Sequence, residues 1–117
     1  MNQKTQIVEL LKETRHLLKR GWCQGAWAKD IQGHPIESSS LKAECFCLMG
    51  AIYRAGLDLH TPIAVRNRAE DFVRNALLAE GEVGGIIVFN DAEDRCLSEV
   101  LKLIDKAITS VETSHDA

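Results

Sequence analysis

The sequence predicts an α+β fold that is mainly α: a compact four-helix domain with a small β-hairpin and one short extended segment. Three observations indicate this class. Apolar residues recur at helical spacing in four separate stretches. Residues 22–37 lack that spacing and contain a turn sequence. A glycine-flanked, β-branched run follows at residues 84–90. We expect one domain over residues 1–117, with frayed ends at residues 1–4 and 112–117.

The first helix is predicted over residues 5–20, where the apolar side chains fall on one stripe. The stripe consists of Ile7, Leu10, Leu11, Leu17 and Leu18. Lys19 and Arg20 crowd the last turn, where positive charge complements the helix dipole. Gly21 is a suitable residue to end the helix. We therefore expect a surface helix with one buried face.

A β-hairpin is predicted next, over about residues 25–36. The turn sequence DIQG at residues 30–33 separates AWAK from HPIE, and neither flank has a helical period. Because two strands alone are marginally stable, the hairpin must pack against another part of the chain.

The second predicted helix covers about residues 41–55. The serines at 38–40 offer N-caps, and Gly56 is placed to end the helix. Every residue from 45 to 53 except Gly50 is apolar. We therefore expect this helix to be central, with the other three helices packed around it.

Two more helices are predicted, separated by the extended segment. Thr61 and Pro62 form a cap and a first-turn proline, and the helix that follows ends near Gly81. The run GGIIVFN predicts an extended segment near residues 86–89 that could pair with the hairpin. A last amphipathic stripe predicts the final helix. It consists of Leu97, Val100, Leu101, Ile104, Ile108 and Val111.

The amino-acid composition argues against two classes of binding partner, membranes and nucleic acids. The chain is 45% hydrophobic and 26% charged with a net charge of −3, which is typical of a soluble globular protein. Its N-terminus lacks the pattern of a secretory signal, and no run reaches the ~18 apolar residues of a membrane span. We expect a cytoplasmic protein without a membrane partner. Nucleic acid is disfavoured because Arg66 and Arg74 are interleaved with Glu70 and Asp71.

The cysteines predict no metal site and no cofactor. Four cysteines occur, at positions 23, 45, 47 and 96, and a cytoplasmic location favours reduced thiols. No Cys-x-x-Cys pair is present, and the predicted helix points Cys45 and Cys47 about 200° apart. A site built from Cys23, Cys96 and His34 would need these distant residues to meet, and nothing in the sequence supports it.

The same cysteines are candidate nucleophiles, and we assign none of them a catalytic role. Cys47 is expected about two turns inside a buried helix, where free cysteine is usually inert packing. Cys23 follows Lys19 and Arg20 at the end of the first helix. The cations favour a thiolate there and the helix carbonyls oppose it, so a structural role is favoured and a reactive thiol stays open.

The stretch VFNDAEDR at residues 88–95 combines turn-forming and charged residues. Asn90 and Asp91 are expected to form a turn, and Asp91 or Asp94 could cap the last helix. Arg95 can bind a carboxylate bidentately, either Asp91 within the fold or an acidic ligand from outside. A turn and helix cap is the favoured interpretation.

Several motifs together resemble a family of small uncharacterised bacterial, cyanobacterial and phage proteins, a domain of unknown function. The motifs are GWCQGAWAKD, FCLMGAIYRA, FND with Arg95, and EVLKLIDKAI, and they span nearly the whole chain. The matching positions are Gly21, Trp22, Cys23, Gly25, Asp30, Gly33, Cys47, Gly50, Ala51, Asn90, Asp91 and Arg95. Phe89 stands where the family pattern has Trp, and Cys96 where it has Thr.

The resemblance implies no activity, but it implies that six of these residues lie together. They are Trp22, Cys23, Cys47, Asn90, Asp91 and Arg95. The Cys96 position removes a good helix cap, at a cost of ~1 kcal/mol unless Asp94 replaces it.

Three functional hypotheses follow. The leading one is a non-catalytic protein-interaction or regulatory module that binds a protein partner or a second copy of itself. The first alternative is a small enzyme or ligand-binding protein that uses Cys23 with Asn90, Asp91 and Arg95. The second is a phage-linked or host regulator associated with DNA. The sequence does not decide whether the protein is an enzyme, although it favours a protein without catalytic activity.

Overall fold

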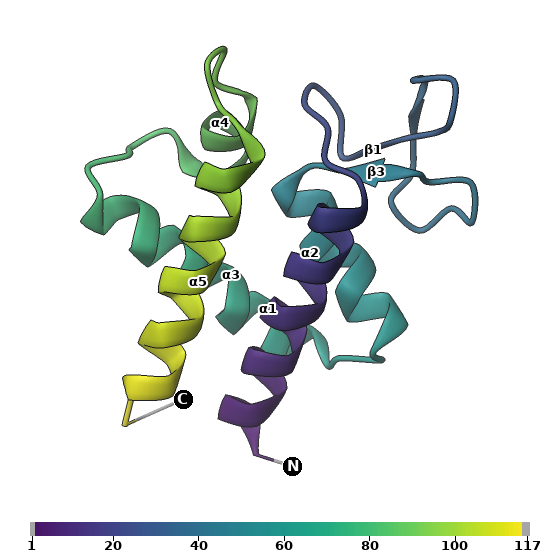
Figure 1. The fold of residues 1–117 in the computed structure, drawn as a ribbon. Coiled ribbons are helices and arrows are strands. Elements are labelled where there is room, and N and C mark those ends of the chain that lie inside the picture. The colour runs from purple at the N-terminus through teal and green to yellow at the C-terminus, as the bar shows by residue number, and fades with distance from the viewer. Residues whose placement is uncertain (1, 116–117) are drawn as a thin grey trace.

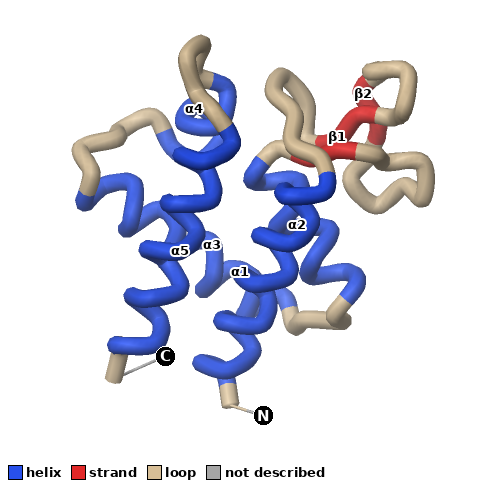
Figure 2. Tube along the Cα trace, viewed as in Figure 1, coloured by secondary structure: helices blue, strands red, loops and turns tan. Residues whose placement is uncertain are grey.

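The computed structural model describes residues 2–115, which form a mainly helical α+β fold (Figure 1). The described part contains five helices, α1 (Gln3–Arg20), α2 (Leu48–Asp58), α3 (Ile63–Ala79), α4 (Gly85–Asp91) and α5 (Leu97–Thr113). It also contains three two-residue strands, β1 (Ala28–Lys29), β2 (Pro35–Ile36) and β3 (Cys45–Phe46). The strands and their loops project beside α2 at one side of the helices (Figure 2).

The first helix, α1, is the centre of the helical packing. It contacts α2, α3, α5 and β3, and its predicted apolar stripe is fully or almost fully buried. Helix α5 runs antiparallel beside it (Figure 1). The expectation that the helix at residues 41–55 is central is therefore wrong. The apolar residues of this stretch are divided between β3 and the shorter helix α2, which contacts α1, α3 and α4, whereas α5 packs against α1 and α3.

The predicted hairpin is confirmed and forms part of a three-stranded antiparallel sheet. Ala28 and Lys29 of β1 pair with Ile36 and Pro35 of β2. In the turn, Asp30 Oδ1 accepts hydrogen bonds from two backbone N–H groups at 2.9 Å each, and Gly33 adopts a positive φ of 83°. On its other side β1 pairs with β3, so the third strand comes from residues 45–46 and not from the segment at 86–89.

Helix α2 begins later than the sequence predicts. Cys47 is its N-cap, whereas the serines at 38–40 lie in a turn outside the helix. The backbone carbonyls of Ser38 and Ser40 accept hydrogen bonds from Arg54 Nη1 at 2.9 and 2.8 Å. Those bonds hold the serine segment beside α2, and the residues between become β3 because β1 offers them an unpaired edge.

Helix α4 replaces the extended segment predicted at residues 86–89, which makes five helices among the described residues where four were expected. Ile86, Phe89 and Asn90 are buried, whereas Ile87 and Val88 are exposed. This spacing is that of one helix face, so packing against α2 and α3 overrides the strand preference of the β-branched run.

The outer helices reach further than expected. Asn2 Oδ1 accepts a hydrogen bond from Thr5 N–H at 2.8 Å, which caps α1 and allows it to begin at Gln3. Helix α5 continues to Thr113. The ends predicted to be frayed, residues 1–4 and 112–117, thus overlap helix by two residues each, and residues 1, 116 and 117 lie outside the described part. No helix within residues 2–115 has the length and apolar character to cross a membrane.

Candidate functional site

The loop after α1 lies against the end of α4, and the backbone fixes its position first. Trp22 forms an isolated parallel bridge with Phe46 of β3. Cys23 N–H donates to the Phe46 carbonyl and Phe46 N–H donates to the Gly21 carbonyl, both at 3.0 Å. The loop at residues 22–25 is therefore an extension of the small sheet, aimed at α4.

Asn90 joins this loop to both α2 and α4. Its side chain is completely buried. Its Oδ1 accepts hydrogen bonds from Trp22 Nε1–H at 2.7 Å and from Leu48 N–H at 3.0 Å. Its Nδ2 donates to the Cys23 carbonyl at 3.1 Å and to Asp91 Oδ1 at 2.9 Å. Because an amide side chain has two donor hydrogens and one oxygen with two lone pairs, all of its capacity is used within the protein.

Two neighbouring residues complete the contact. Gln24 Nε2 donates to the carbonyls of Asn90 and Ala92 at 2.9 Å each, which satisfies acceptors at the end of α4. Gly25 N–H donates to Asp91 Oδ1 at 3.1 Å. The structure thus brings Trp22, Cys23, Asn90 and Asp91 together, with Cys47 adjacent to the Leu48 amide that Asn90 binds. Gln24 was not among the predicted residues.

Cys23 lies beside two other thiols and is unsuited to nucleophilic attack. Burial, the neighbouring Cys45 thiol and negative charge on Cys45 or Cys47 raise the pKa of Cys23 from 9.0 to about 12, against a smaller lowering by Lys29. At neutral pH the thiol is therefore protonated, whereas the reactive form of cysteine is the thiolate. The cation that acts to lower the pKa of Cys23 is Lys29, whereas the sequence had indicated Lys19 and Arg20.

Cys47 occupies a different position from the one predicted. It is the N-cap of α2, where its Sγ accepts a hydrogen bond from Gly50 N–H at 3.3 Å, and it is not two turns inside the helix. Burial raises the pKa of the Cys47 thiol above 9.0, although the first-turn amides of Gly50 and Met49 act to lower it. The role of a buried N-cap accounts for Cys47, and no catalytic role is needed to explain its position.

Arg95 binds groups other than the predicted Asp91. Its Nε donates to the Phe89 carbonyl at 2.8 Å, and its guanidinium carbon lies 3.7 Å from the Phe89 ring centre. Its terminal nitrogens lie 3.3 Å from a Glu99 oxygen and 3.6 Å from a Glu82 oxygen. The residue therefore holds the end of α4 to the start of α5, and Asp91 is not its partner within the fold.

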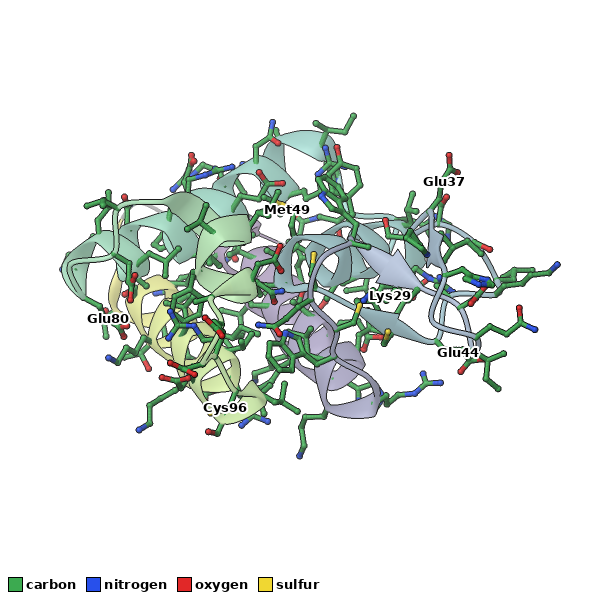
Figure 3. The ribbon with its side chains drawn as sticks, turned by 90° about the horizontal axis from the view of Figure 1, so that it is seen from above. Lys29, Glu37, Glu44, Met49, Glu80 and Cys96 are labelled. Atoms are coloured by element: carbon green, nitrogen blue, oxygen red, sulfur yellow. The ribbon has the colours of Figure 1, made fainter. Side chains whose placement is uncertain are left out.

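The start of α5 keeps a cap in spite of Cys96. Glu99 Oε1 accepts a hydrogen bond from Cys96 N–H at 3.0 Å, and this bond and the nearby Arg95 lower the pKa of Glu99 below 4.5. Asp94, the predicted substitute cap, makes no such bond. Cys96 is exposed and lies well away from Glu37 (Figure 3). Within residues 2–115 no three or more His, Cys, Asp or Glu side chains are arranged to hold a metal ion.

The arginines of α3 are also engaged within the fold. Arg66 Nε lies 3.8 Å from Glu70, and Arg74 lies 3.2 Å from another oxygen of the same carboxylate. Arg68 donates to the side chain of Gln3 at 3.0 Å. These contacts direct the charges of α3 towards neighbouring side chains and leave no continuous basic stripe on this helix.

A second feature, missed at the sequence level, is a surface hollow of about 430 Å³ between the sheet and α2. Its lining consists of Trp27, Glu37, Ser38, Ser39, Tyr53 and Leu57. The rings of Trp27 and Tyr53 lie 5.1 Å apart between centres and are tilted by 56°. Trp27 is 39% exposed although it is large and apolar. Arg66 lies 4.0 Å from the Tyr53 ring centre.

The backbone of Trp27, which lines the hollow, is held by contacts with the start of α2. Its carbonyl accepts a hydrogen bond from Cys47 N–H at 3.1 Å. Gly50, in the first turn of α2, lies so close that a Cβ there would be 1.9 Å from the same carbonyl oxygen. Only glycine permits this approach, so the Gly50 position of the family motif fixes where the Trp27 ring emerges.

The polar side-chain groups of the hollow have no partner within residues 2–115. Within residues 2–115 neither the Trp27 indole N–H nor the hydroxyls of Tyr53, Ser38 and Ser39 form hydrogen bonds, and Glu37 forms no ion pair. Trp22, five residues away from Trp27, has its indole bound by Asn90. Ligand sites are commonly hollows lined mostly by apolar and aromatic side chains with a few polar groups. Trp27 and Tyr53 lie in two separate motifs, GWCQGAWAKD and FCLMGAIYRA, and nothing in the sequence indicated that their rings meet.

Comparison with known proteins assigns the chain to a family. Residues 2–110 match the model of a family of unknown function (DUF6197). The chain belongs to this family. Membership covers the elements α1 to most of α5, including the loop at residues 22–25 and the hollow, and confirms the expected relation to a family of unknown function. Comparison with curated proteins gives no significant match, and comparison with solved structures gives none either.

Proposed function

We propose that the protein is a non-catalytic protein-interaction module that binds its partner at the hollow between Trp27 and Tyr53. The observation that carries the proposal is the set of unpartnered polar groups beside two aromatic rings. Exposed aromatic residues in a concave surface are typical anchors of protein interfaces, because they bury large area with few rotatable bonds.

The motif residues favour a structural over a catalytic part in this function. The side chain of Asn90 has no free donor or acceptor, and Arg95 is held by two carboxylates and a carbonyl. Cys23 and Cys47 both have raised pKa values. We infer that the loop at residues 22–25 and α4 hold the sheet in place, and that the sheet presents the hollow.

A selection with a displayed library of random short peptides tests the interaction. The full chain is immobilised, and enriched peptides are titrated against the wild type and two variants. Trp27→Ala removes the aromatic wall, so we expect it to abolish binding. Ile31→Ala is the matched control, because Ile31 is a large apolar residue of the same hairpin, is 85% exposed and lies outside the hollow.

Two outcomes would contradict the proposal. Enriched peptides that bind Trp27→Ala as well as the wild type would place the interaction elsewhere. Failure to enrich any peptide would argue against peptide recognition altogether.

Iodoacetamide labelling with mass-spectrometric mapping tests separately whether a cysteine of the protein is activated for catalysis. Exposed Cys96 should be modified at neutral pH well before Cys23. Preferential labelling of Cys23 would instead indicate an activated thiol.

A further inference from the structure

The charges around the hollow indicate what its occupant carries. Glu37 is the one charged residue among those that line it, and no cation within residues 2–115 pairs with its carboxylate. The two arginines nearby are already neutralised. Arg54 Nε lies 3.1 Å from Asp58, and Arg66 Nε lies 3.8 Å from Glu70. The lining therefore carries a net negative charge that nothing in the described chain offsets.

We propose that the hollow binds a basic side chain, lysine or arginine, presented by a partner protein; this deepens the interaction function proposed above and rests on it. The alkyl stem of such a side chain packs on Trp27 and Leu57, and its cationic head reaches Glu37 and the hydroxyls of Ser38 and Ser39. An aromatic face attracts a cation as well as an apolar stem.

Tyr53 has a narrower part in this arrangement. The Arg66 guanidinium already lies over its ring, 4.0 Å from the centre, so that face is not available to a second cation. The Tyr53 hydroxyl has no hydrogen-bond partner within residues 2–115 and can accept a hydrogen bond from the bound head group. Trp27 then supplies the ring face, and Tyr53 supplies the polar contact.

A second hollow of similar volume does not offer the same chemistry. It has a volume of about 470 Å³ and lies between α3 and α5. Its lining contains no aromatic residue, and its charges are largely paired. Lys106 contacts Glu80, and Asp105 Oδ1 lies 2.8 Å from Arg15 Nε. The Trp27 hollow therefore has an aromatic wall beside an unpaired carboxylate, and the hollow between α3 and α5 lacks the aromatic wall.

Nuclear magnetic resonance of the full chain tests the inference, because the protein has two tryptophans and so two indole N–H signals. The Trp27 signal reports on the hollow, and the Trp22 signal, whose N–H is bound by Asn90, serves as the internal reference. The probes are capped glycine tripeptides with a central lysine, arginine, norleucine or citrulline. We expect saturable shifts of the Trp27 signal with lysine or arginine, and much smaller shifts with the two neutral probes.

A pair of charge variants sharpens the test. Glu37→Gln should weaken binding of the basic probes about fivefold, which is the upper range for one exposed ion pair. Glu93→Gln removes the same charge from an exposed residue between α4 and α5 and should leave binding unchanged. Equal responses to norleucine and lysine, or unchanged binding by Glu37→Gln, would overturn the inference.

The inference and the proposed function can fail separately. If the basic tripeptides leave Trp27 unmoved while the library still yields peptides that require Trp27, the ligand chemistry is wrong and the interaction function stands. A Trp27 shift that depends on protein concentration without any peptide would show that a second copy of the chain fills the hollow. That result would overturn the assignment to a partner protein.

Discussion

Asn90 is the residue on which the contact between three segments depends. Its side chain binds the loop at Trp22 and Cys23, the first amide of α2 at Leu48, and Asp91 of its own helix. Buried hydrogen-bonding groups are costly when they lose their partners, because no water replaces them. The loss of this one amide would therefore affect all three segments.

We predict that Asn90→Ala lowers the free energy of unfolding by about 3 kcal/mol, because it leaves the Trp22 indole, the Leu48 amide and the Cys23 carbonyl without their partner. Urea titration measures the change. Asp94→Ala is the control, since Asp94 is exposed and forms no interaction within residues 2–115, and it should change the value by less than about 0.5 kcal/mol. A similar loss in both variants would contradict the role of Asn90.

Cys23 predicts a specific dependence of stability on alkaline pH. The thiol has a pKa of about 12 in the folded protein and an ordinary value of 9.0. Between these two pH values the unfolded chain releases the thiol proton and the folded chain keeps it. Deprotonation therefore stabilises the unfolded state relative to the folded state. Stability from this group is complete below pH 9 and is lost as the pH rises towards 12.

The measurement is the free energy of unfolding as a function of pH for the wild type and Cys23→Ser. Serine does not titrate, so the variant should lose less stability than the wild type above pH 9. Lysine and tyrosine titrate in both proteins, and the difference between the two curves removes their contribution. Identical curves would show that the folded thiol titrates as it does in the unfolded chain.

At the scale of single residues, the sequence predicted only part of the candidate site. It identified Trp22, Cys23, Asn90 and Asp91 as residues that belong together, and their hydrogen bonds bring them together. It did not indicate that Asn90 is saturated or that Arg95 binds Glu82 and Glu99. Those facts depend on the direction of side chains across a tertiary contact, which residue spacing does not encode.

At the scale of elements, long amphipathic helices were predictable and short elements were not. Helices α1, α3 and α5 follow from clear stripes and end near their expected bounds. Helix α4 was expected to be extended because its β-branched residues favour strands, yet packing decided otherwise. The start of α2 was placed too early because Cys47, a less usual cap than serine, caps it.

Arg95 attaches the short helix α4, which has few buried residues of its own, to α5. It joins the Phe89 carbonyl of α4 to Glu99 in the first turn of α5 and stacks on the Phe89 ring. We predict that Arg95→Lys lowers the free energy of unfolding by about 1 kcal/mol, because lysine keeps the charge but loses the planar stacking and the forked donors. Thermal unfolding followed by circular dichroism measures it.

Lys12→Arg is the matched control for this exchange. Lys12 is exposed on α1 and forms no ion pair or hydrogen bond within residues 2–115, so the swap should be close to neutral. If Arg95→Lys were equally neutral, charge alone would hold α4 to α5. The stacking on Phe89 would then contribute little.

At the scale of the whole molecule, one apolar core connects the elements. It includes residues of all five described helices and of β1 and β3. The radius of gyration of 13.4 Å is that of a compact chain of this length. The sheet has no separate core, since its buried residues Ala28 and Phe46 belong to the same cluster as those of the helices.

We therefore predict that the sheet and helices unfold in one cooperative transition. Far-ultraviolet circular dichroism reports on the helices, and the near-ultraviolet signal of Trp22 and Trp27 reports on the sheet side. In urea the two should give coincident curves. An earlier loss of the near-ultraviolet signal would show that the loop at residues 22–25 and the sheet detach from the helices before these unfold.

The close contact between Gly50 and the Trp27 carbonyl has a consequence for binding kinetics. The indole emerges from backbone that is wedged against α2 and bonded to Cys47, so only its side-chain torsions are left to order. When a ligand packs against a side chain held in this way, the protein loses little conformational entropy. Association should then proceed at similar rates for related ligands, and their affinities should differ mainly through how long each one stays bound.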